Sequence, residues 1–481
     1  MIPLTLAEIA AAVGGRLYRA DGAERVTGSV EFDSREVGPG GLFVAMPGER
    51  VDGHDFAPKA VAAGAVGVLA ARAVDAPAVI VPPVSDGHRR SVALAGDRDG
   101  SGAAVLAGLG ELARAVADRL AARGLVTIGV TGSSGKTSTK DLLAQSLEPM
   151  GATVAPPGSF NNELGHPWTV LRAGEATRYL VLELSARGPG HIAALCRTAP
   201  PRIGVVLNVG TAHLGEFGSR EGIARTKGEL VEALPADGLA VLNADDQVVR
   251  GMASRTQARV VLVGTADNAD VRAVDIALDD QARASFRLFT PVGETFVRLG
   301  LYGAHHVGNA LACAAVAVEL GAGVDEVAER LSGARRLSAR RMEVTTRPDG
   351  VTVLNDSYNA NPESVGAALH TLAAMAGCGR RSWAVLGMMG ELGESSDAAH
   401  EEIGRLAARL GVDRLVVVGE VAAPVLAGFT GRESVLLSDV SAAAELLSAE
   451  LRPDDVVLIK ASKVAALWRV ADALLAGGDA A

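Results

Sequence analysis

The chain has 481 residues, with a hydrophobic content of 48% and a charged content of 21%. It is too long for a single hydrophobic core and suggests about three domains, and its composition excludes a disordered protein. The formal net charge of −10 argues against broad nucleic-acid binding. An anionic substrate must therefore be bound by local basic pockets rather than by the field of the whole molecule.

Compartment and membrane association follow from a few local features. Cys196, Cys313 and Cys378 lie far apart, without metal-ligand spacing, and are typical of free thiols in a reducing compartment. The first residues, MIPLTLAEIAAAVGG, have no basic start before the apolar run and contain Glu8, which argues against a secretory signal. No uninterrupted apolar run of about 20 residues occurs, so no membrane span is expected. The sequence predicts a cytoplasmic protein.

Residues 1–82 are predicted to form a small α/β domain. The helix-like segments TLAEIAAAVGG and HDFAPKAVAAGA alternate with the short apolar strands LFVAM, VGVLAA and AVIVP. The next stretch, PPVSDGHRRSVALAGDRDGSGAA, is rich in Pro, Gly and charge and is interpreted as a connection.

Two further α/β domains are predicted, over residues 83–334 and 335–481. From about residue 125 the strands LVTIGV, YLVLEL, IGVVLN, LAVLN and RVVLVG alternate with helical segments, which predicts a doubly wound, mostly parallel sheet. Residues 271–300 predict β-hairpins appended to that sheet, and two helices follow. A second strand–helix alternation begins near residue 341 and predicts a C-terminal domain of Rossmann type. The fold class is thus α/β with three domains.

The stretch VTIGVTGSSGKTSTKDLL runs from an apolar strand through a Gly/Ser turn into a helix. A phosphate-binding loop needs glycines that let backbone N–H groups wrap phosphate oxygens, a Lys for the β/γ-phosphates and a Ser or Thr hydroxyl for Mg²⁺. These parts are supplied by Gly132, Gly135, Lys136 and Thr137. The strict pattern has Gly where this chain has Val130, with Gly129 one position earlier. The alternative is a glycine-rich turn with a chance Lys-Thr; we expect the turn to bind ATP or GTP.

Three other side chains are candidates for the same site. Glu183 ends the apolar strand YLVLEL, where a carboxylate is costly unless it meets a cation, and carboxylates suit Mg²⁺; the alternative is an exposed strand end. His213 follows VLNVGTA near the carboxyl edge of the sheet, where ligands bind in such folds. Taken alone, it also fits a structural histidine. Lys227 lies on a predicted amphipathic helix and by itself predicts a solvated lysine.

Further motifs along the chain resemble the Mur ligase family. In order they are PGSFNNELGHPWTVL, YLVLELSARGPGHI, VVLNVGTAHLGEFGSREGIARTKGEL, HHVGNALACAA, RRMEV, NDSYNANPESV and LGMMGELGESSDAAH. The N-terminal stretch FDSREVGPGGLFVAMPGERVDGHDF resembles the family's UDP-sugar domain. Gly129 fills the first glycine position of this family's loop, which accounts for Val130. NNELGHP and DSYNANP resemble the branch that adds D-alanyl-D-alanine, and the DNPR box of the diaminopimelate-adding branch does not occur.

The resemblance implies an ATP-dependent amide ligase of cell-wall synthesis. It would join D-alanyl-D-alanine to UDP-N-acetylmuramoyl-tripeptide through an acyl phosphate, giving the pentapeptide precursor of peptidoglycan, ADP and phosphate. ATP and two Mg²⁺ ions are the implied cofactors, and a monomer that binds no nucleic acid is expected. Whether the third residue of the tripeptide is lysine or a diaminopimelate stays open.

The resemblance also assigns residues. Lys136, Glu183, His213 and Lys227 are implied to be catalytic, and the metal ligands would be Thr137, Glu183, His213 and a carbamylated Lys227. The positions that match ATP contacts are Gly132, Ser133, Ser134, Gly135, Lys136, Thr137, Ser138, Asn309, Arg341 and Asp356. Those that match substrate contacts are Ser34 and Arg35 for the uridine diphosphate, Asn161 and Asn162 for the muramoyl-peptide, and Tyr358, Asn359 and Asn361 near the incoming dipeptide.

The sequence departs from the family pattern at a few positions, and other functions remain as alternatives. Met388 replaces an Asp, Ala461 and Lys463 alter a late KGSR motif, and the usual PGR before the third domain reads Ala339-Arg340-Arg341 after Ser338. They leave the phosphate loop intact. The alternatives are a folylpolyglutamate-type ligase and a phosphate-loop regulator without a catalytic step. A regulatory GTPase is disfavoured because LNADDQ lacks the lysine of a guanine-reading motif.

Overall fold

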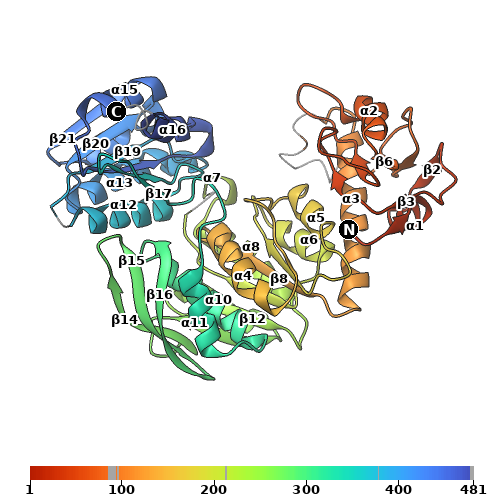
Figure 1. The fold of residues 1–481 in the computed structure, drawn as a ribbon, viewed down its shortest axis with the longest axis horizontal. Coiled ribbons are helices and arrows are strands. Elements are labelled where there is room, and N and C mark those ends of the chain that lie inside the picture. Colours follow the sequence, from red (N-terminus) through yellow and green to blue (C-terminus); the bar gives the residue numbers. More distant parts are fainter. Residues whose placement is uncertain (85–93, 95–96, 212–213, 378, 477–481) are drawn as a thin grey trace.

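The computed structural model describes residues 1–84, 94, 97–211, 214–377 and 379–476. Three α/β units follow one another along an arc, from the N-terminal unit through the central unit to the C-terminal unit (Figure 1). Each main sheet draws its strands from one of the three ranges predicted from the sequence. The predicted α/β fold class with three units is thus confirmed.

The N-terminal unit is a five-stranded sheet with strand order β2-β7-β6-β5-β4, parallel except for β2. Its strands are β2 (Arg16–Tyr18), β4 (Val30–Glu31), β5 (Leu42–Val44), β6 (Gly67–Ala70) and β7 (Ala78–Ile80), and a separate pair is formed by β1 (Leu4–Thr5) and β3 (Arg25–Val26). Its helices are α1 (Leu6–Ala12) and α2 (Ala57–Ala62). Helix α1 begins in a capping box, because Thr5 Oγ1 accepts from the Glu8 backbone N–H and the Glu8 carboxylate accepts from that of Thr5.

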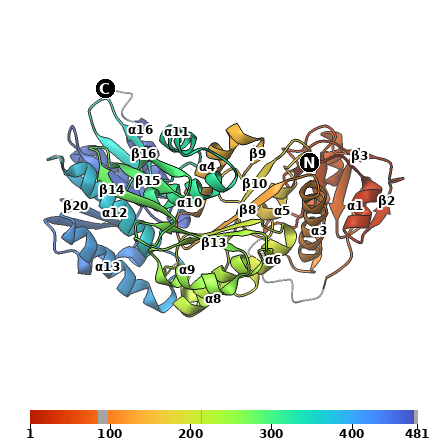
Figure 2. The ribbon, with the colours of Figure 1, turned by 90° about the horizontal axis from the view of Figure 1, so that it is seen from below.

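A long helix, α3 (Ser101–Ala121), joins the N-terminal unit to the central one. Figure 2 shows α3 between the N-terminal unit and the central unit. The helix buries Leu109 and Leu112 in a core that also contains Leu4 of the first unit and Leu180 of the central sheet. The helix starts inside the stretch that was expected to be a connection, so the last residues of that connection, from Ser101 onward, are helical. Most of the rest of the stretch lies outside the described residues.

The central unit is a nine-stranded sheet with order β16-β15-β14-β13-β12-β11-β8-β10-β9. The strands are β8 (Val126–Thr131), β9 (Thr153–Val154), β10 (Tyr179–Glu183), β11 (Ile203–Val206), β12 (Leu239–Asn243), β13 (Arg259–Gly264), β14 (Val271–Leu278), β15 (Arg283–Thr290) and β16 (Gly293–Tyr302). The last three pair antiparallel, as the predicted hairpins require, and the others are parallel. The helices are α4 (Lys136–Leu147), α5 (Gly165–Val170), α6 (His191–Thr198), α7 (Leu214–Phe217), α8 (Arg220–Glu232), α9 (Gln247–Gly251), α10 (His306–Glu319) and α11 (Val324–Gly333).

The chain order changes direction at β8. After β8 the chain builds β9 and β10 on one side of that strand and then returns to add β11 on the other. In open parallel sheets, ligands bind outside the carboxyl ends of the strands at such a switch point. The glycine-rich turn follows β8 directly, so the topology places it where a ligand is expected.

The C-terminal unit is a six-stranded sheet with order β17-β18-β22-β19-β20-β21, parallel except for β17. Its strands are β17 (Glu343–Thr346), β18 (Thr352–Asn355), β19 (Ser382–Leu386), β20 (Arg414–Val418), β21 (Glu433–Leu437) and β22 (Val456–Lys460). Its helices are α12 (Pro362–Ala376), α13 (Ser396–Arg409), α14 (Pro424–Gly428), α15 (Val440–Glu450) and α16 (Trp468–Ala476). The last strand, β22, lies in the middle of this sheet, between β18 and β19.

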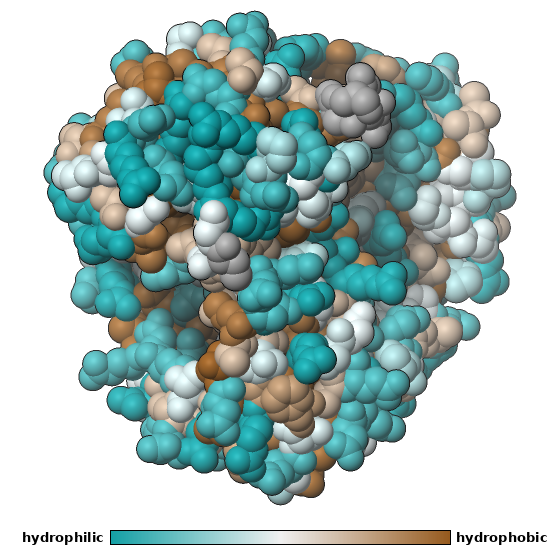
Figure 3. All heavy atoms as spheres, turned by 60° about the vertical axis from the view of Figure 1, so that its left-hand side comes forward, coloured by the Kyte–Doolittle hydropathy of each residue, from teal (hydrophilic) through white to brown (hydrophobic). Residues whose placement is uncertain are grey.

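The surface is mainly hydrophilic on the face shown in Figure 3, with apolar residues in small groups. Within the described ranges no helix is both long enough and apolar enough to cross a bilayer.

Candidate nucleotide and ligase site

The glycine-rich turn has the backbone of a phosphate-binding loop. Strand β8 ends at Thr131, and α4 begins at Lys136 after Gly135, whose φ is +82°. A side chain at Gly135 would be strained by this φ, and its Cβ would come within 2.7 Å of Asn309 Oδ1. The turn therefore requires glycine here, and it leaves the N-terminus of α4 open to an anion.

The loop is fixed by a residue that the sequence analysis missed. The Asn208 carbonyl oxygen accepts from the Ser133 backbone N–H at 3.1 Å, and Asn208 Oδ1 accepts from that of Ser134 at 2.9 Å. The Ser133 hydroxyl in turn accepts from the Gly210 N–H at 2.9 Å. Asn208 follows β11, the strand next to β8, so the loop is held in place from the neighbouring strand. In the sequence, only the position of Asn208 at the end of a predicted strand could have indicated this role.

Lys136 lies folded over its own loop. Its Nζ donates to the Gly132 carbonyl oxygen at 2.8 Å. Burial lowers the pKa of the ammonium, the nearby Glu183 carboxylate opposes that shift, and the Arg341 guanidinium adds to it. A bound anion would raise the pKa of Lys136 again, because it would bring negative charge close to the ammonium group.

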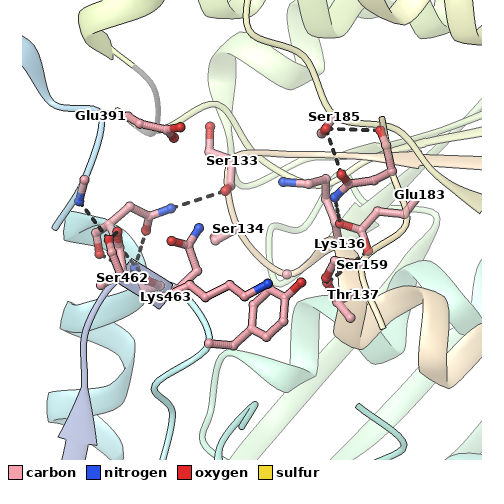
Figure 4. Close-up of a pocket in the computed structure, with 18 of the residues that line it drawn as sticks. Ser133, Ser134, Lys136, Thr137, Ser159, Glu183, Ser185, Glu391, Ser462 and Lys463 are labelled. Atoms are coloured by element: carbon pink, nitrogen blue, oxygen red, sulfur yellow. Dashed lines mark hydrogen bonds between the residues drawn. The ribbon is translucent and has the colours of Figure 1, made fainter. Parts of the chain in front are cut away.

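Glu183 is buried beside the loop. Its side chain is 1% exposed, Oε2 accepts from Thr137 Oγ1 at 2.9 Å and Oε1 accepts from Asn161 Nδ2 at 2.6 Å (Figure 4). This burial excludes the alternative of an exposed strand end. Two of the predicted metal ligands, Thr137 and Glu183, are thus in direct contact, and they present the hard oxygen donors that Mg²⁺ prefers.

An arginine of the C-terminal unit contacts the residues around Thr137. Nη2 of Arg341 donates to Thr137 Oγ1 at 3.2 Å and to Ser159 Oγ at 3.3 Å, and the two hydroxyl oxygens lie 2.8 Å apart. The guanidinium also stacks over the ring of Tyr358, 4.3 Å from its centroid. Ser159 was not predicted, since a lone serine in a loop carries no sequence signal.

Lys227 is buried, contrary to what its helix alone predicts. It lies on α8, whose N-cap is Ser219, and is 6% exposed. Burial lowers the pKa of its ammonium well below the ordinary value, and Lys136 lowers it further. No carboxylate of the described residues pairs with it. The interpretation as a solvated lysine was wrong because α8 packs against the central sheet on the face that carries Lys227.

The remaining predicted metal ligand, His213, lies outside the described residues. In the part of the chain that the structure describes, no group of three or more His, Cys, Asp and Glu side chains is close enough to hold a metal ion.

The C-terminal unit closes the other side of the loop. Asn361 caps α12, since its Oδ1 accepts from the Ser364 N–H at 2.8 Å, and its Nδ2 donates to the Ser133 carbonyl oxygen at 3.3 Å. Asp356 accepts from the Met342 N–H at 3.0 Å and from Lys460 Nζ at 2.6 Å. The predicted contacts Asn361 and Asp356 therefore already have protein partners.

Two more contacts join the central and C-terminal units. Glu363 Oε1 accepts from the Thr211 backbone N–H at 2.5 Å and from its hydroxyl at 2.9 Å. Arg187, which follows β10, pairs with Glu391 of the C-terminal unit at 3.1 Å. The sequence analysis missed both acidic residues and Arg187, because each pair joins positions more than 150 residues apart.

A cleft of about 410 Å³ lies between the central and C-terminal units (Figure 4). Of the predicted site residues, it is lined by Ser133, Ser134, Gly135, Lys136, Thr137, Ser138, Asn161, Glu183, Arg341, Tyr358, Asn359 and Asn361. Asn162 is not among the lining residues; its Oδ1 instead accepts from the Gly165 N–H at the start of α5. Ser34 and Arg35 lie in the N-terminal unit, where Arg35 pairs with Asp33.

A second cavity of about 280 Å³ adjoins the first and shares Ser138 and Arg341 with it. Its wall includes His306, whose Nδ1 lies 3.3 Å from Asn309 Nδ2. Burial lowers the pKa of His306 well below its ordinary value, so the imidazole is neutral. Asn309 is thus brought between this cavity and Gly135 of the loop.

The departures from the family pattern leave the site intact. At position 388 the observed contact is made by the backbone: the Met388 carbonyl oxygen accepts from the Ser462 N–H at 2.9 Å. Ala461 is fully buried, and Lys463 lines the cleft. The hydrogen bond at position 388 is thus made by the backbone and does not use the methionine side chain.

Family models match most of the chain. The Mur ligase family catalytic domain matches residues 27–114, the Mur ligase middle domain residues 130–317, and the Mur ligase glutamate ligase domain residues 340–463. The chain belongs to the Mur ligase family.

Comparison with individual proteins indicates one particular kind of Mur ligase. The chain is 58% identical to the UDP-N-acetylmuramoyl-tripeptide--D-alanyl-D-alanine ligase of Mycobacterium tuberculosis, over 99% of this chain and 98% of that one. Among solved structures, MurF from Acinetobacter baumannii has a TM-score of 0.85 at 30% identity and covers 98% and 99% of the two chains. MurF from Thermotoga maritima in complex with ADP has a TM-score of 0.78 at 30% identity, with 94% and 98% covered.

Proposed function

We propose that this chain is an ATP-dependent ligase that joins D-alanyl-D-alanine to UDP-N-acetylmuramoyl-tripeptide. The observation that carries the proposal is the cleft in which Lys136, Thr137 and Glu183 of the central unit face Arg341 and Tyr358 of the C-terminal unit. The named relatives that align over nearly the whole chain support the choice of substrates. We also propose that the protein acts as a monomer in the cytoplasm.

The phosphates of ATP would bind at the loop after β8. The N-terminus of α4 and the loop N–H groups attract anions. Lys136 would exchange the Gly132 carbonyl for the β/γ-phosphate oxygens, and Arg341 would neutralise charge from the opposite side. Phosphoryl transfer depends mainly on positioning and charge neutralisation, which these two cations supply. The base and ribose would occupy the 280 Å³ cavity beside Asn309 and His306.

The oxygen donors fit a divalent cation. Glu183 and Thr137 would hold Mg²⁺, which would neutralise the phosphate oxygens when bound. Asn161 keeps Glu183 in place through its hydrogen bond of 2.6 Å to Oε1. Arg341, which contacts the Thr137 hydroxyl in this structure, would move from that hydroxyl to the phosphates.

Lys227 would serve the second cation as a carbamate. This proposal rests on the family resemblance and is supported by the burial of the side chain and by the absence of any described carboxylate partner. A bare ammonium next to Lys136 would repel a metal ion, whereas a carbamate reverses the sign of its charge. His213 would complete this site, as the resemblance implies.

The bond chemistry follows from these positions. The terminal carboxylate of the tripeptide takes the γ-phosphoryl group of ATP and becomes an acyl phosphate, releasing ADP. The amine of D-alanyl-D-alanine then attacks the acyl carbon, loses a proton and displaces phosphate, which forms the amide. Ser34 and Arg35 would bind the uridine diphosphate and Asn161 the peptide. A cleft between two units keeps water from the acyl phosphate.

The experiment is a substrate panel with the purified protein. ATP, Mg²⁺, D-alanyl-D-alanine and a UDP-N-acetylmuramoyl-tripeptide should give ADP, phosphate and a pentapeptide product of the expected mass. Tripeptides with lysine and with a diaminopimelate are assayed in parallel. Product from pteroate and glutamate instead would favour a folate-type ligase, and no phosphate release with any pair would favour a regulator; either result would refute the proposal.

A further inference from the structure

The segment that enters the C-terminal unit has an unusual backbone on both sides of Arg341. Arg340 has a φ of +58° and Met342 a φ of +47°, in the left-handed region that residues other than Gly, Asn and Asp seldom adopt. Such conformations persist where the surrounding structure imposes them, and they are concentrated at functional sites. Because Arg341 lies between the two strained residues, this turn sets the direction of its side chain.

The backbone of the turn is tied to the C-terminal unit. The Arg340 N–H donates to Glu343 Oε2 at 3.2 Å, and the Arg340 carbonyl oxygen accepts from the Tyr358 N–H at 3.2 Å. The Met342 N–H donates to Asp356 Oδ1 at 3.0 Å. Both strained residues are thus held by hydrogen bonds to other segments of the same unit.

The Arg340 side chain adds a contact that a glycine could not make. Its guanidinium lies over the ring of Trp468, the first residue of α16, at 4.1 Å from the ring centroid. The PGR pattern of the family has glycine where this chain has Arg340, and glycine adopts a positive φ without a steric penalty. The stack on Trp468 offsets the strain that an arginine brings to the same turn.

We propose that Arg340 is a positioning residue for nucleotide binding: its stack on Trp468 stabilises the left-handed turn that directs Arg341 toward the phosphate loop. The inference rests on the proposed function, in which Arg341 binds the phosphates of ATP. Neither Arg340 nor Trp468 is among the residues that line the two cavities, so both act through Arg341.

The role of the turn is to set the fraction of molecules in which Arg341 is in place. In the present turn the Arg341 guanidinium reaches the hydroxyls of Thr137 and Ser159. A turn relaxed to a right-handed backbone would redirect residue 341 away from them. The apparent dissociation constant of a ligand rises by the inverse of the competent fraction. Loss of the stack should therefore weaken ATP binding, whereas saturating ATP should restore the competent turn and, with it, turnover.

The test compares alanine with glycine at position 340. Both substitutions remove the stack, but only alanine keeps the strain of a positive φ. The left-handed backbone disfavours a residue with a Cβ by a factor of about 5 to 30. We expect Arg340→Ala to raise the dissociation constant of adenylyl imidodiphosphate, measured by calorimetry, and the KM for ATP by about that factor. Its kcat at saturating ATP should stay within about 2-fold of the wild type. Arg340→Gly should bind the analogue several times more tightly than Arg340→Ala.

The stacking partner gives an independent test. Trp468→Leu should weaken binding of the analogue as Arg340→Ala does, and the double variant Arg340→Gly/Trp468→Leu should recover most of the lost affinity. A role of Trp468 in packing alone would not be relieved by glycine at position 340. The matched controls are Asp454→Ala and Asp454→Gly, because Asp454 also has a positive φ, of +68°, but precedes β22, at the other end of that strand from Ser462. Both controls should bind the analogue with wild-type affinity.

Two results would overturn the inference: equal affinities of Arg340→Ala and Arg340→Gly for the analogue, or a double variant that binds no better than Trp468→Leu. A wild-type protein that does not bind adenylyl imidodiphosphate would instead refute the proposed function.

Discussion

Replacing Asp356 by Asn should destabilise the C-terminal unit. Lys460 is 1% exposed, and its Nζ donates to Asp356 Oδ2 at 2.6 Å and to the Asn359 carbonyl oxygen at 2.9 Å. Removing one charge of a buried pair costs about 3–5 kcal/mol, because the other charge stays buried and uncompensated. We expect the lower end, about 3 kcal/mol, since the amide oxygen of Asn and the backbone carbonyls still accept from Lys460.

This loss corresponds to a shift in melting temperature of about 6–12 °C, taking roughly 2–4 °C per kcal/mol for a unit of this size. Differential scanning calorimetry measures the melting temperatures of the variant and the wild-type protein. The matched control is Asp349→Asn, whose carboxylate is 39% exposed and pairs with Arg347, and its transition should move by no more than about 2 °C. The double variant Asp356→Asn/Lys460→Met should be more stable than Asp356→Asn, because it removes the unpaired ammonium.

Two results would contradict this prediction: an Asp356→Asn variant that unfolds within about 2 °C of the wild-type protein, or a further fall in melting temperature when Lys460→Met is added. Either result would mean that the carboxylate is not needed to hold the ammonium. Asp356 would then be free to act only through a nucleotide, as the family resemblance implies for this position.

Three further predictions concern the phosphate loop, the buried lysine and a buried histidine. Lys136→Ala should lower turnover at saturating ATP by about 100-fold or more, since it removes charge from the transferring phosphoryl group; near-native turnover in a steady-state assay would contradict the assignment. Lys227→Arg should lose most activity while remaining folded at the assay temperature, and bicarbonate-free buffer should slow the wild-type enzyme reversibly; a fully active arginine variant would rule out the carbamate. His166 is fully buried, and burial lowers its pKa to about 4 from 6.5. Between pH 4 and pH 6.5 the unfolded chain binds a proton at this histidine, whereas the folded protein does not. The free energy of unfolding therefore falls as the pH drops from 6.5 to 4, by about 2 kcal/mol at pH 5. His166→Leu should therefore lose about 2 kcal/mol less between pH 8 and pH 5 in urea unfolding than the wild-type protein, and an equal loss would refute the assignment.

The phosphate loop was predictable because its signal is local. Gly135, Lys136 and Thr137 are consecutive, and the strand before them and the helix after them have clear apolar patterns. The alternation of strands and helices likewise predicted the class of each sheet, since the period of apolar residues reflects which faces are buried.

Residues whose environment depends on distant packing were not predictable in the same way. Lys227 reads as solvated on its own helix, and only the packing of α8 against the sheet buries it. Arg187 and Glu391 carry no local pattern, because their contact forms between two units. Ser159 lies in a loop, and its place beside Thr137 is set by the path of that loop rather than by its neighbours in sequence.

The position of β22 has a consequence for how the chain is made. On a ribosome that adds about 5–20 residues per second, the place of β22 between β18 and β19 stays empty for roughly 5–20 s after β18 emerges, because about 100 residues separate β18 from β22. During that interval Asp356 has no ammonium partner, and the loop with Ser462 and Lys463 does not yet exist. The phosphate loop is synthesised early, yet it meets its opposite wall only at the end of translation. A chain truncated before Val456 would lack β22 and, with it, the loop of Ser462 and Lys463 that lines the cleft opposite the phosphate loop.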